Sequence, residues 1–264
     1  MRTTIVPFLF WLAVVTIGQA AHGRDSTQNE TLDSVFEENG VVATIVVASA
    51  DSDQVYIHNR DRSKLQFSPA STFKIPNTLI ALDAMVVTSA ETTFAWDGVE
   101  RGVAAWNRNQ TLQSAFRFSC VWCYQEIARS VGIERYADAL AAVAYGNQQL
   151  GKHVDQFWLN GDLQISAIEQ IGFLRKLLDY SIPFQRQYVD ILKSIMLVEQ
   201  SSDYTLYAKT GWTGVELHVG WYVGYIEKGE DTWLFAMNMR MDSAKQASLR
   251  KDLTIQSLRA LEII

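Results

Sequence analysis

Residues 68–83 read SPASTFKIPNTLIALD, and the assignment of secondary structure starts from them. Apolar residues recur from here at helical spacing and form one stripe: Ile75, Leu79, Leu82 and Val86. Pro76 is tolerated only in the first turns of a helix, because proline lacks the N–H group that later turns require. The pattern therefore predicts a helix over 71–87 that begins close to Ser71.

The same stretch carries an S-x-x-K motif, formed by Ser71 and Lys74. Side chains at i and i+3 on a helix face the same way. A serine hydroxyl is a weak nucleophile and needs a base beside it, and a lysine becomes such a base when burial lowers its pKa. A serine at a helix start also has backbone N–H groups nearby for an oxyanion. The motif alone is common, since Ser248–Lys251 matches it too.

Three further motifs follow Ser71 and occur once each: S-x-V at 119–121, Y-G-N at 145–147 and K-T-G at 209–211. Each also fits a plain structural role, as a helix N-cap, a turn and the end of a strand. Trp158 likewise fits a core position, and Arg250 fits the solvated face of a helix. The ordered set outweighs these separate readings and predicts one active site.

Strands are predicted on both sides of a helical middle. The β-branched run Val41–Ala48 predicts a buried strand that pairs with 55–57 as a hairpin. Three further strands follow late in the chain, over 204–209, 219–227 and 232–239, and an amphipathic helix over 243–263 closes it. Residues 24–35 are polar and predict a loose leader.

The middle of the chain predicts helices over 120–131 and 183–198, and Ser166 with Glu169 forms a capping box before a third. This order indicates an α+β fold, in which N- and C-terminal strands form one antiparallel sheet flanked by helices. We expect a single domain over 24–264, with an inserted helical subdomain over roughly 88–200 and a cleft at the junction.

The N-terminus has the layout of a secretory signal peptide. Arg2 precedes the apolar run Ile5–Ile17, and small residues follow it. We predict a signal peptide over 1–20, with cleavage between 20 and 23, and export to a bacterial periplasm. An uncleaved anchor is the less favoured alternative, because the run is short for a membrane span. No second run of spanning length occurs, so no stable membrane anchor is expected.

Composition excludes some classes of partner. Hydrophobic residues make up 48% and charged residues 20%, as in an ordinary globular protein, and the formal net charge is −6. Without a clustered Lys/Arg run, an acidic chain is a poor candidate for nucleic acid.

The two cysteines, Cys120 and Cys123, form a C-x-x-C pair. Such a pair occurs in redox motifs and as half of a zinc site, but the four histidines show no ligand spacing such as H-E-x-x-H. We therefore expect no metal, and either two buried thiols or one local disulfide.

From about Phe67 to the C-terminus the chain resembles the class D (oxacillinase-type) serine β-lactamases. The S-x-x-K and K-T-G elements are shared with other penicillin-recognising enzymes, whereas S-x-V, Y-G-N and F-W-L point to class D. The segments that carry the resemblance are SPASTFKIPNTLIALD, WDGV, AWNR, FSCVW, YGNQ, FWLNGDLQISAIEQ, YAKTGW, GWYVGYIEK and the final LRK. The resemblance implies the penicillin-recognising serine enzyme fold and hydrolysis of the β-lactam ring. Cys120 inside the S-x-V motif is a departure, because a thiol so close to the site is open to oxidation.

The resemblance also implies a role for each catalytic residue. Ser71 is expected to become acylated, and Lys74, as an N-carboxylated lysine, to act as the general base. Ser119 is expected to pass a proton to the leaving nitrogen, and Lys209 to add positive charge near Ser71 and the substrate carboxylate. Carbon dioxide or bicarbonate is needed to carboxylate Lys74, and no other cofactor is expected.

Substrate binding falls on the residues around K-T-G: Thr210, Gly211, Trp212 and Arg250. The backbone N–H groups of Ser71 and Trp212 are expected to bind the oxyanion, and the planar guanidinium of Arg250 to pair with the substrate carboxylate. Val121, Trp158 and Leu159 are expected to surround the carbamate, with the indole N–H of Trp158 donating to one of its oxygens.

The expected partners are small-molecule β-lactams, and the sequence sets no oligomeric state. Three alternatives stay open: a β-lactam sensor that is acylated at Ser71 without turnover, a peptidoglycan DD-peptidase, and a non-catalytic binding module. Turnover separates the first from an enzyme, the S-x-V and F-W-L elements disfavour the second, and a covalent label at Ser71 excludes the third.

Overall fold

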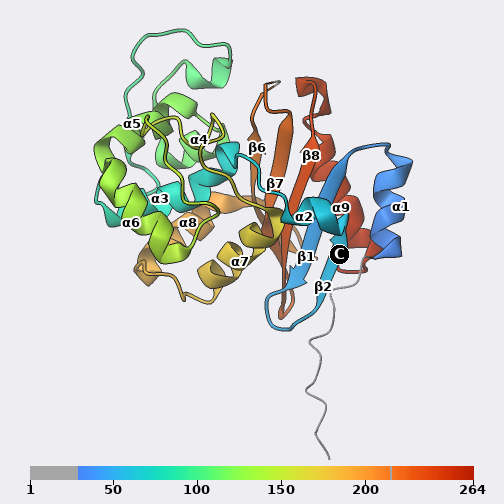
Figure 1. Ribbon diagram of the computed structural model, residues 1–264. Coiled ribbons are helices and arrows are strands. Elements are labelled where there is room, and N and C mark those ends of the chain that lie inside the picture. Colours follow the sequence, from blue (N-terminus) through green and yellow to red (C-terminus); the bar gives the residue numbers. More distant parts are fainter. Residues whose placement is uncertain (1–28, 215) are drawn as a thin grey trace, which may run out of the picture.

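The computed structural model describes residues 29–214 and 216–264. Within them, one antiparallel sheet of six strands runs through the centre in the order β2-β1-β8-β7-β6-β5 (Figure 1). The predicted signal peptide lies outside the described residues. The strands are β1 (Ala43–Ser49), β2 (Val55–His58), β5 (Leu197–Gln200), β6 (Thr205–Trp212), β7 (Val219–Lys228) and β8 (Asp231–Arg240). This is the predicted α+β architecture.

Helices cover both faces of the sheet (Figure 1). On one side lie α1 (Glu30–Glu38) and α9 (Leu249–Ala260), and on the other lie the helices from the middle of the chain. These are α3 (Lys74–Asp83), α4 (Leu112–Arg117), α5 (Val121–Val131), α6 (Ile133–Val143), α7 (Ala167–Leu178) and α8 (Arg186–Met196). The short α2 (Arg60–Lys64) follows β2.

The position of β1 inside the covered sheet explains why its sequence is apolar without alternation. All seven of its residues are buried, because both faces of the sheet are covered. Val46 and Ala48 join the core on the side of α3–α8, whereas Ile45 and Val47 join the core beneath α1 and α9. The strand therefore separates two hydrophobic cores.

The late strands form the predicted hairpin, and each of the three is longer than predicted. Strands β7 and β8 pair up to Lys228 and Asp231, so the turn consists of Gly229 and Glu230. Strand β6 pairs with β7 as far as Trp212. The K-T-G motif was expected to end a strand, and it lies inside one instead.

The prediction of a loose leader over 24–35 was wrong for its described part. Helix α1 begins at Glu30, and the side chain of Asn29 caps it by accepting from two backbone N–H groups. Leu32 and Phe36 lie one helical turn apart and are both buried, and Phe36 stacks on His58 at 4.3 Å. Two apolar side chains at this spacing are enough to dock a polar helix.

Several helix bounds also differ from the sequence prediction. The predicted helix over 71–87 begins as the 3₁₀ helix η1 (Ala70–Phe73) and ends at Asp83, where Met85 turns to φ 56°. Val86 and Val87, the last apolar residues of the predicted helix, therefore lie in a loop and pack against the core from there. The predicted closing helix over 243–263 consists of two helices, η3 (Ala244–Gln246) and α9. The last two residues of the predicted helix over 183–198 belong to strand β5 instead.

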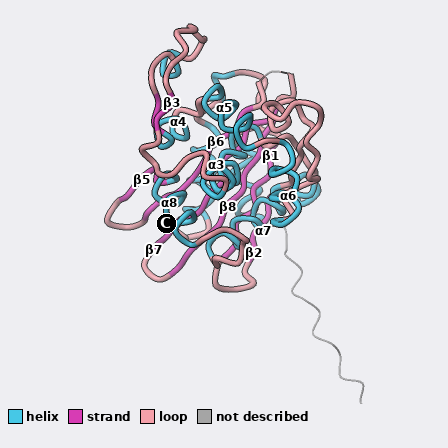
Figure 2. The backbone as a smooth tube through the Cα atoms, turned by 90° about the vertical axis from the view of Figure 1, so that its left-hand side faces the viewer, coloured by secondary structure: helices cyan, strands magenta, loops and turns pink. Residues whose placement is uncertain are grey.

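A loop projects from the helical side of the molecule (Figure 2). It connects the two strands of a small sheet, β3 (Thr93–Phe94) and β4 (Gln110–Thr111), and carries the 3₁₀ helix η2 (Ala104–Trp106).

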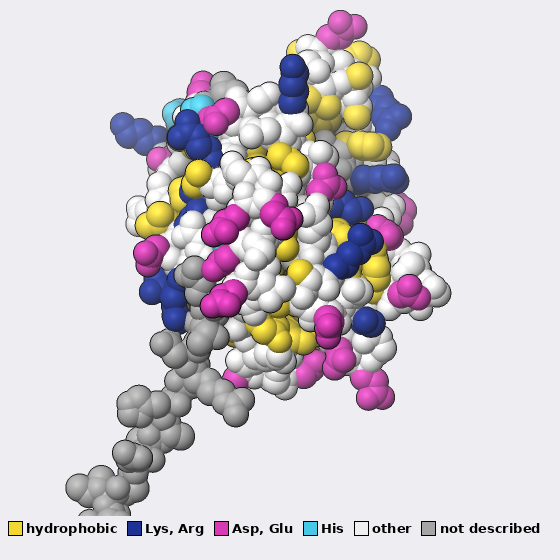
Figure 3. Space-filling model, turned by 90° about the vertical axis from the view of Figure 1, so that its right-hand side faces the viewer, with side chains coloured by type: hydrophobic (Ala, Val, Ile, Leu, Met, Phe, Trp, Pro, Cys, Tyr) yellow, Lys and Arg dark blue, Asp and Glu magenta, His cyan; other side chains and the backbone are white. Residues whose placement is uncertain are grey.

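On the face that Figure 3 shows, acidic and basic side chains are interspersed. In the described ranges, no helix is long and apolar enough to cross a membrane.

Candidate active site

Ser71 lies in a tight turn that the protein holds from two sides. The preceding residue, Ala70, has φ 48°, a conformation that L-residues rarely adopt. The N–H group of Ala70 and the hydroxyl of Ser68 both donate to the carbonyl of Trp158, at 3.0 and 2.8 Å. The indole of Trp221 donates to the carbonyl of Ser68 at 2.9 Å. These bonds fix the backbone that presents Ser71.

Lys74 is buried directly beside Ser71. Its Nζ atom lies 3.1 Å from the Ser71 hydroxyl oxygen, and its side chain is 1% exposed. The ring of Tyr124 lies 4.7 Å from the same nitrogen. Burial lowers the pKa of Lys74 to about 7, because an apolar surrounding disfavours the charged form. A neutral amine is therefore accessible to Ser71 at neutral pH.

The structure brings Ser119 and Lys209 together as a second pair. The Lys209 amine donates to the Ser119 hydroxyl at 2.5 Å and to the carbonyl of Thr210 at 3.0 Å. Burial, with the positive charges of Lys74 and Arg250, holds the pKa of Lys209 well below its usual value. Two lysines thus share one buried region, each next to a serine.

Gly211 lets strand β6 pack directly on the turn that carries Ser71. A Cβ atom at Gly211 would lie 2.9 Å from the carbonyl oxygen of Pro69 and 3.2 Å from the Thr72 methyl group. Both distances are closer than side chains normally approach. The glycine of K-T-G is therefore required by the spacing between the strand and the turn.

Arg250 reaches the same strand from α9. Its guanidinium donates to the carbonyl of Gly211 at 2.6 Å and to that of Ala247 at 2.9 Å. Burial lowers the pKa of Arg250 to about 10, so it keeps its charge at neutral pH. Trp212 ends the strand half-buried, and its indole nitrogen has no hydrogen-bond partner among the described residues.

Trp158 belongs to an aromatic cluster around Phe73, the residue before Lys74. It is 1% exposed and stacks on Phe73 with ring centroids 5.6 Å apart. Tyr145 of the Y-G-N motif meets Phe73 edge-on at 5.8 Å. Val121 begins α5 and Leu159 follows Trp158, and both are half-buried. That these residues support a carbamate stays a prediction.

The sequence reasoning missed Tyr124. Its hydroxyl bonds to that of Thr78 at 2.8 Å, and its ring packs on the Lys74 amine. Nothing in the sequence separates Tyr124 from other core aromatics, because the contact depends on how α5 crosses α3. The side chain adds to the apolar wall that lowers the pKa of Lys74.

A cavity of about 600 Å³ lies beside this site. It runs between α4, the end of α8, β5 and β6, and it meets the site at Lys209 and Thr210. Ser71 itself does not line it.

The two cysteines next to Ser119 form a disulfide, Cys120–Cys123, which is one of the two alternatives that the sequence left open.

The model of the penicillin binding protein transpeptidase domain matches residues 37–256. The chain is 39% identical to the β-lactamase OXA-48 of Klebsiella pneumoniae, over all of both chains. It is 36% identical to OXA-2 of Salmonella typhimurium, over 97% of this chain and 94% of that relative. The chain belongs to the class D β-lactamases.

Solved structures of class D β-lactamases have the same fold. That of YbXI from Nostoc superposes with a TM-score of 0.86 at 37% identity, covering 89% of this chain and 99% of that one. That of FUS-1 (OXA-85) from Fusobacterium nucleatum subsp. polymorphum superposes with a TM-score of 0.87 at 32% identity, covering 90% and 100%.

Proposed function

We propose that this class D β-lactamase hydrolyses the lactam amide of penicillins and related antibiotics through an acyl-enzyme at Ser71, and so confers resistance. The observation that carries the proposal is the buried Lys74 amine, 3.1 Å from the Ser71 hydroxyl. A neutral base in contact with a serine is what nucleophilic attack requires.

Acylation uses both serine–lysine pairs. The Ser71 oxygen attacks the lactam carbonyl carbon while its proton passes to the base at Lys74. When the carbon–nitrogen bond breaks, the leaving nitrogen takes a proton from Ser119, and Lys209 replaces that proton through their 2.5 Å hydrogen bond. The backbone N–H groups of Ser71 and Trp212 are proposed to stabilise the oxyanion.

Deacylation repeats the chemistry with water as the nucleophile. The proton that Lys74 received during acylation first replaces the one that Lys209 gave up, so that the base is free again. The base then takes a proton from the water, the oxygen of which attacks the ester carbon, and it passes this proton to the Ser71 oxygen as the ester bond breaks. The product is an opened lactam with a free carboxylate. A chain with an acylated Ser71 but no such base would stop before this step.

Lys74 also fits carboxylation. Carbon dioxide bound to its amine would supply a carbamate, which is a stronger hydrogen-bond acceptor and base than the amine. Only a neutral amine can add carbon dioxide, and burial lowers the pKa of Lys74 to about 7. Trp158 would hold a carbamate oxygen through its indole N–H, and Val121 and Leu159 would keep water away.

Thr210, Gly211 and Arg250 would bind the substrate. Gly211 brings β6 against the Ser71 turn, so a ligand along this strand lies beside the nucleophile. Arg250 is fixed by two backbone carbonyls and keeps its charge, which suits a substrate carboxylate.

We further propose that the protein is exported to a bacterial periplasm after cleavage of residues 1–20. The apolar run Ile5–Ile17 supports export, and so does the Cys120–Cys123 disulfide. Disulfides persist in oxidising compartments such as the periplasm and are rare in the cytosol.

Hydrolysis of a chromogenic cephalosporin by the purified mature protein, with and without bicarbonate, tests the proposal. We expect many turnovers per enzyme, and a higher rate with bicarbonate. A single stoichiometric burst with a stable ester at Ser71 would instead indicate a sensor or a peptidase. No reaction and no label at Ser71 would indicate a binding module.

A further inference from the structure

Ser119 has a backbone conformation that its surroundings must hold in place. Its φ is 55°, in the left-handed region, although it is not a glycine. It lies in the short link between α4 and α5, and its hydroxyl accepts the 2.5 Å hydrogen bond from Lys209. Since a residue in this region is strained, the geometry of the Ser119–Lys209 pair depends on what fixes the link.

On the side of α4, the link is fixed by backbone hydrogen bonds. Three successive N–H groups donate to carbonyls of that helix: Phe118 to Ser114 at 2.9 Å, Ser119 to Phe116 at 3.1 Å, and Cys120 to Ala115 at 2.8 Å. These bonds set the path of the chain up to Cys120. They do not set where the next helix begins.

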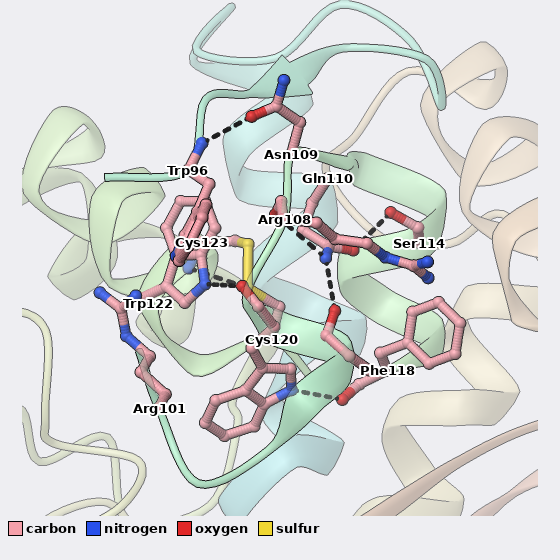
Figure 4. Close-up of a disulfide and its surroundings, with 12 residues drawn as sticks. Trp96, Arg101, Arg108, Asn109, Gln110, Ser114, Phe118, Cys120, Trp122 and Cys123 are labelled. Atoms are coloured by element: carbon pink, nitrogen blue, oxygen red, sulfur yellow. Dashed lines mark hydrogen bonds between the residues drawn. A yellow bond between two sulfur atoms is a disulfide. The ribbon is translucent and has the colours of Figure 1, made fainter. Parts of the chain in front are cut away.

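On the side of α5, the disulfide takes the place of an ordinary helix cap (Figure 4). Cys120 is the N-cap residue and Cys123 lies in the first turn of the helix. A serine or aspartate at the N-cap would bond to this turn, whereas sulfur is a weak acceptor, here 3.3 Å from the Cys123 nitrogen. The covalent bond therefore fixes the N-cap of α5, which is the residue directly after Ser119.

Two tryptophans attach the same link to η2, and Figure 4 labels one of them, Trp122. The Trp122 indole donates to the carbonyl of Trp106 at 3.0 Å, and the Trp106 indole donates to the carbonyl of Phe118 at 2.8 Å. Trp122 lies inside the loop that the disulfide closes. The crosslink thus orients Trp122, and through Trp106 it also supports the residue that precedes Ser119.

We propose that the Cys120–Cys123 disulfide is a positioning element, which keeps the Ser119 hydroxyl on the Lys209 amine for proton delivery during acylation. Both cysteines are fully buried, which suits a permanent link. The proposal rests on the proposed function of this site. It predicts that loss of the crosslink slows acylation, in which Ser119 acts, and spares deacylation, in which the base at Lys74 acts.

The test is single-turnover acylation by a penicillin, followed by mass spectrometry, for the wild type and for Cys120→Ala/Cys123→Ala. We expect acylation to slow by about tenfold or more, as small misplacements of catalytic groups do, while deacylation stays within about twofold. Equal acylation rates would overturn the proposal. If the wild type itself is not acylated, it is the proposed function that fails.

A double-mutant cycle with Ser119→Ala separates positioning from general loosening. If the crosslink acts through Ser119, its loss has no further effect in the Ser119→Ala background. Additive losses would overturn the proposal. If the double-alanine variant does not fold, as judged by circular dichroism, the wild type refolded in the presence of a reductant replaces it in the same assays. The reductant then acts on this disulfide alone, because the chain has only 2 cysteines.

Discussion

The Lys74 amine lies 3.1 Å from the Ser71 hydroxyl, and the lysine side chain is 1% exposed. The two residues are separated by one turn of a helix that starts as 3₁₀ at Ala70. The sequence motif sets their spacing, but only the packed protein supplies the burial that lowers the pKa of the amine. The activity of the site should therefore follow the protonation of Lys74.

We expect kcat/KM to rise with pH and to level off above an apparent pKa near 7. Burial lowers the pKa of Lys74 to about 7, so below this pH the amine is protonated and can neither accept the Ser71 proton nor add carbon dioxide. The measurement is the pH profile of kcat/KM with a chromogenic cephalosporin. A profile that levels off near pH 4 would point instead to a carboxylate base, whose ordinary pKa is about 4.

Removing either member of this pair should give a distinct defect. Ser71→Ala should abolish both acylation and deacylation, because the nucleophile is gone. Lys74→Ala should abolish deacylation at least, since water has no base beside the ester. Mass spectrometry after mixing with a penicillin checks both variants. Full turnover by either one would contradict the assignment of the site.

The sequence predicted the α+β fold, and it named residues that the structure brings together, Ser71 with Lys74 and Ser119 with Lys209. Motifs can do this because they report on chemistry that requires particular side chains. It did not predict Tyr124, the ring of which lies over Lys74, since that contact depends on how two helices cross. Nor did it predict helix α1. Leu32 and Phe36 are only two apolar residues in a polar stretch, and they become meaningful once α9 and His58 lie beneath them.

The redox state of the cysteines also depended on the structure. A C-x-x-C spacing fits thiols and a disulfide equally well, and the path of the chain at the start of α5 decides between them.

For the K-T-G motif, by contrast, the sequence alone was enough to predict the structural role of the glycine. Its glycine was expected to allow close approach, and Gly211 does lie against Pro69.

Gly211→Ala should lower kcat/KM by about a hundredfold while the protein stays folded. The new Cβ would lie 2.9 Å from the Pro69 carbonyl oxygen, so β6 must shift away from the Ser71 turn, and a shift of about 1 Å has an effect of this size. Gly172→Ala is the control, because nothing lies within 4 Å of a Cβ there. The measurement is kcat/KM from steady-state kinetics of both variants. Equal activity would show that the strand can move without cost.

Phe36→Ala should destabilise the protein without changing its chemistry. The ring is 1% exposed and stacks on His58, and loss of a buried phenylalanine costs about 3–5 kcal/mol of unfolding free energy. Val42→Ala is the control, since Val42 is 58% exposed and exposed sites change stability by less than about 0.5 kcal/mol. Urea denaturation measures both. A cost near that of the control would mean that α1 contributes little to the fold.

Trp158 offers a test of carboxylation that separates its N–H group from its packing. Trp158→Ala should weaken retention of the carbamate, so that its activity depends more steeply on added bicarbonate than that of the wild type. Trp158→Phe keeps an aromatic ring beside Phe73, on which the indole stacks at 5.6 Å, but removes the N–H group.

If the indole N–H holds the carbamate, the phenylalanine variant should need more bicarbonate as well. The measurement is initial rate against bicarbonate concentration for the three proteins at one pH. A bicarbonate dependence equal to that of the wild type in both variants would show that Trp158 is only a core residue. A change in the alanine variant alone would assign the effect to lost packing against Phe73, because the phenylalanine variant keeps a ring there and the alanine variant does not.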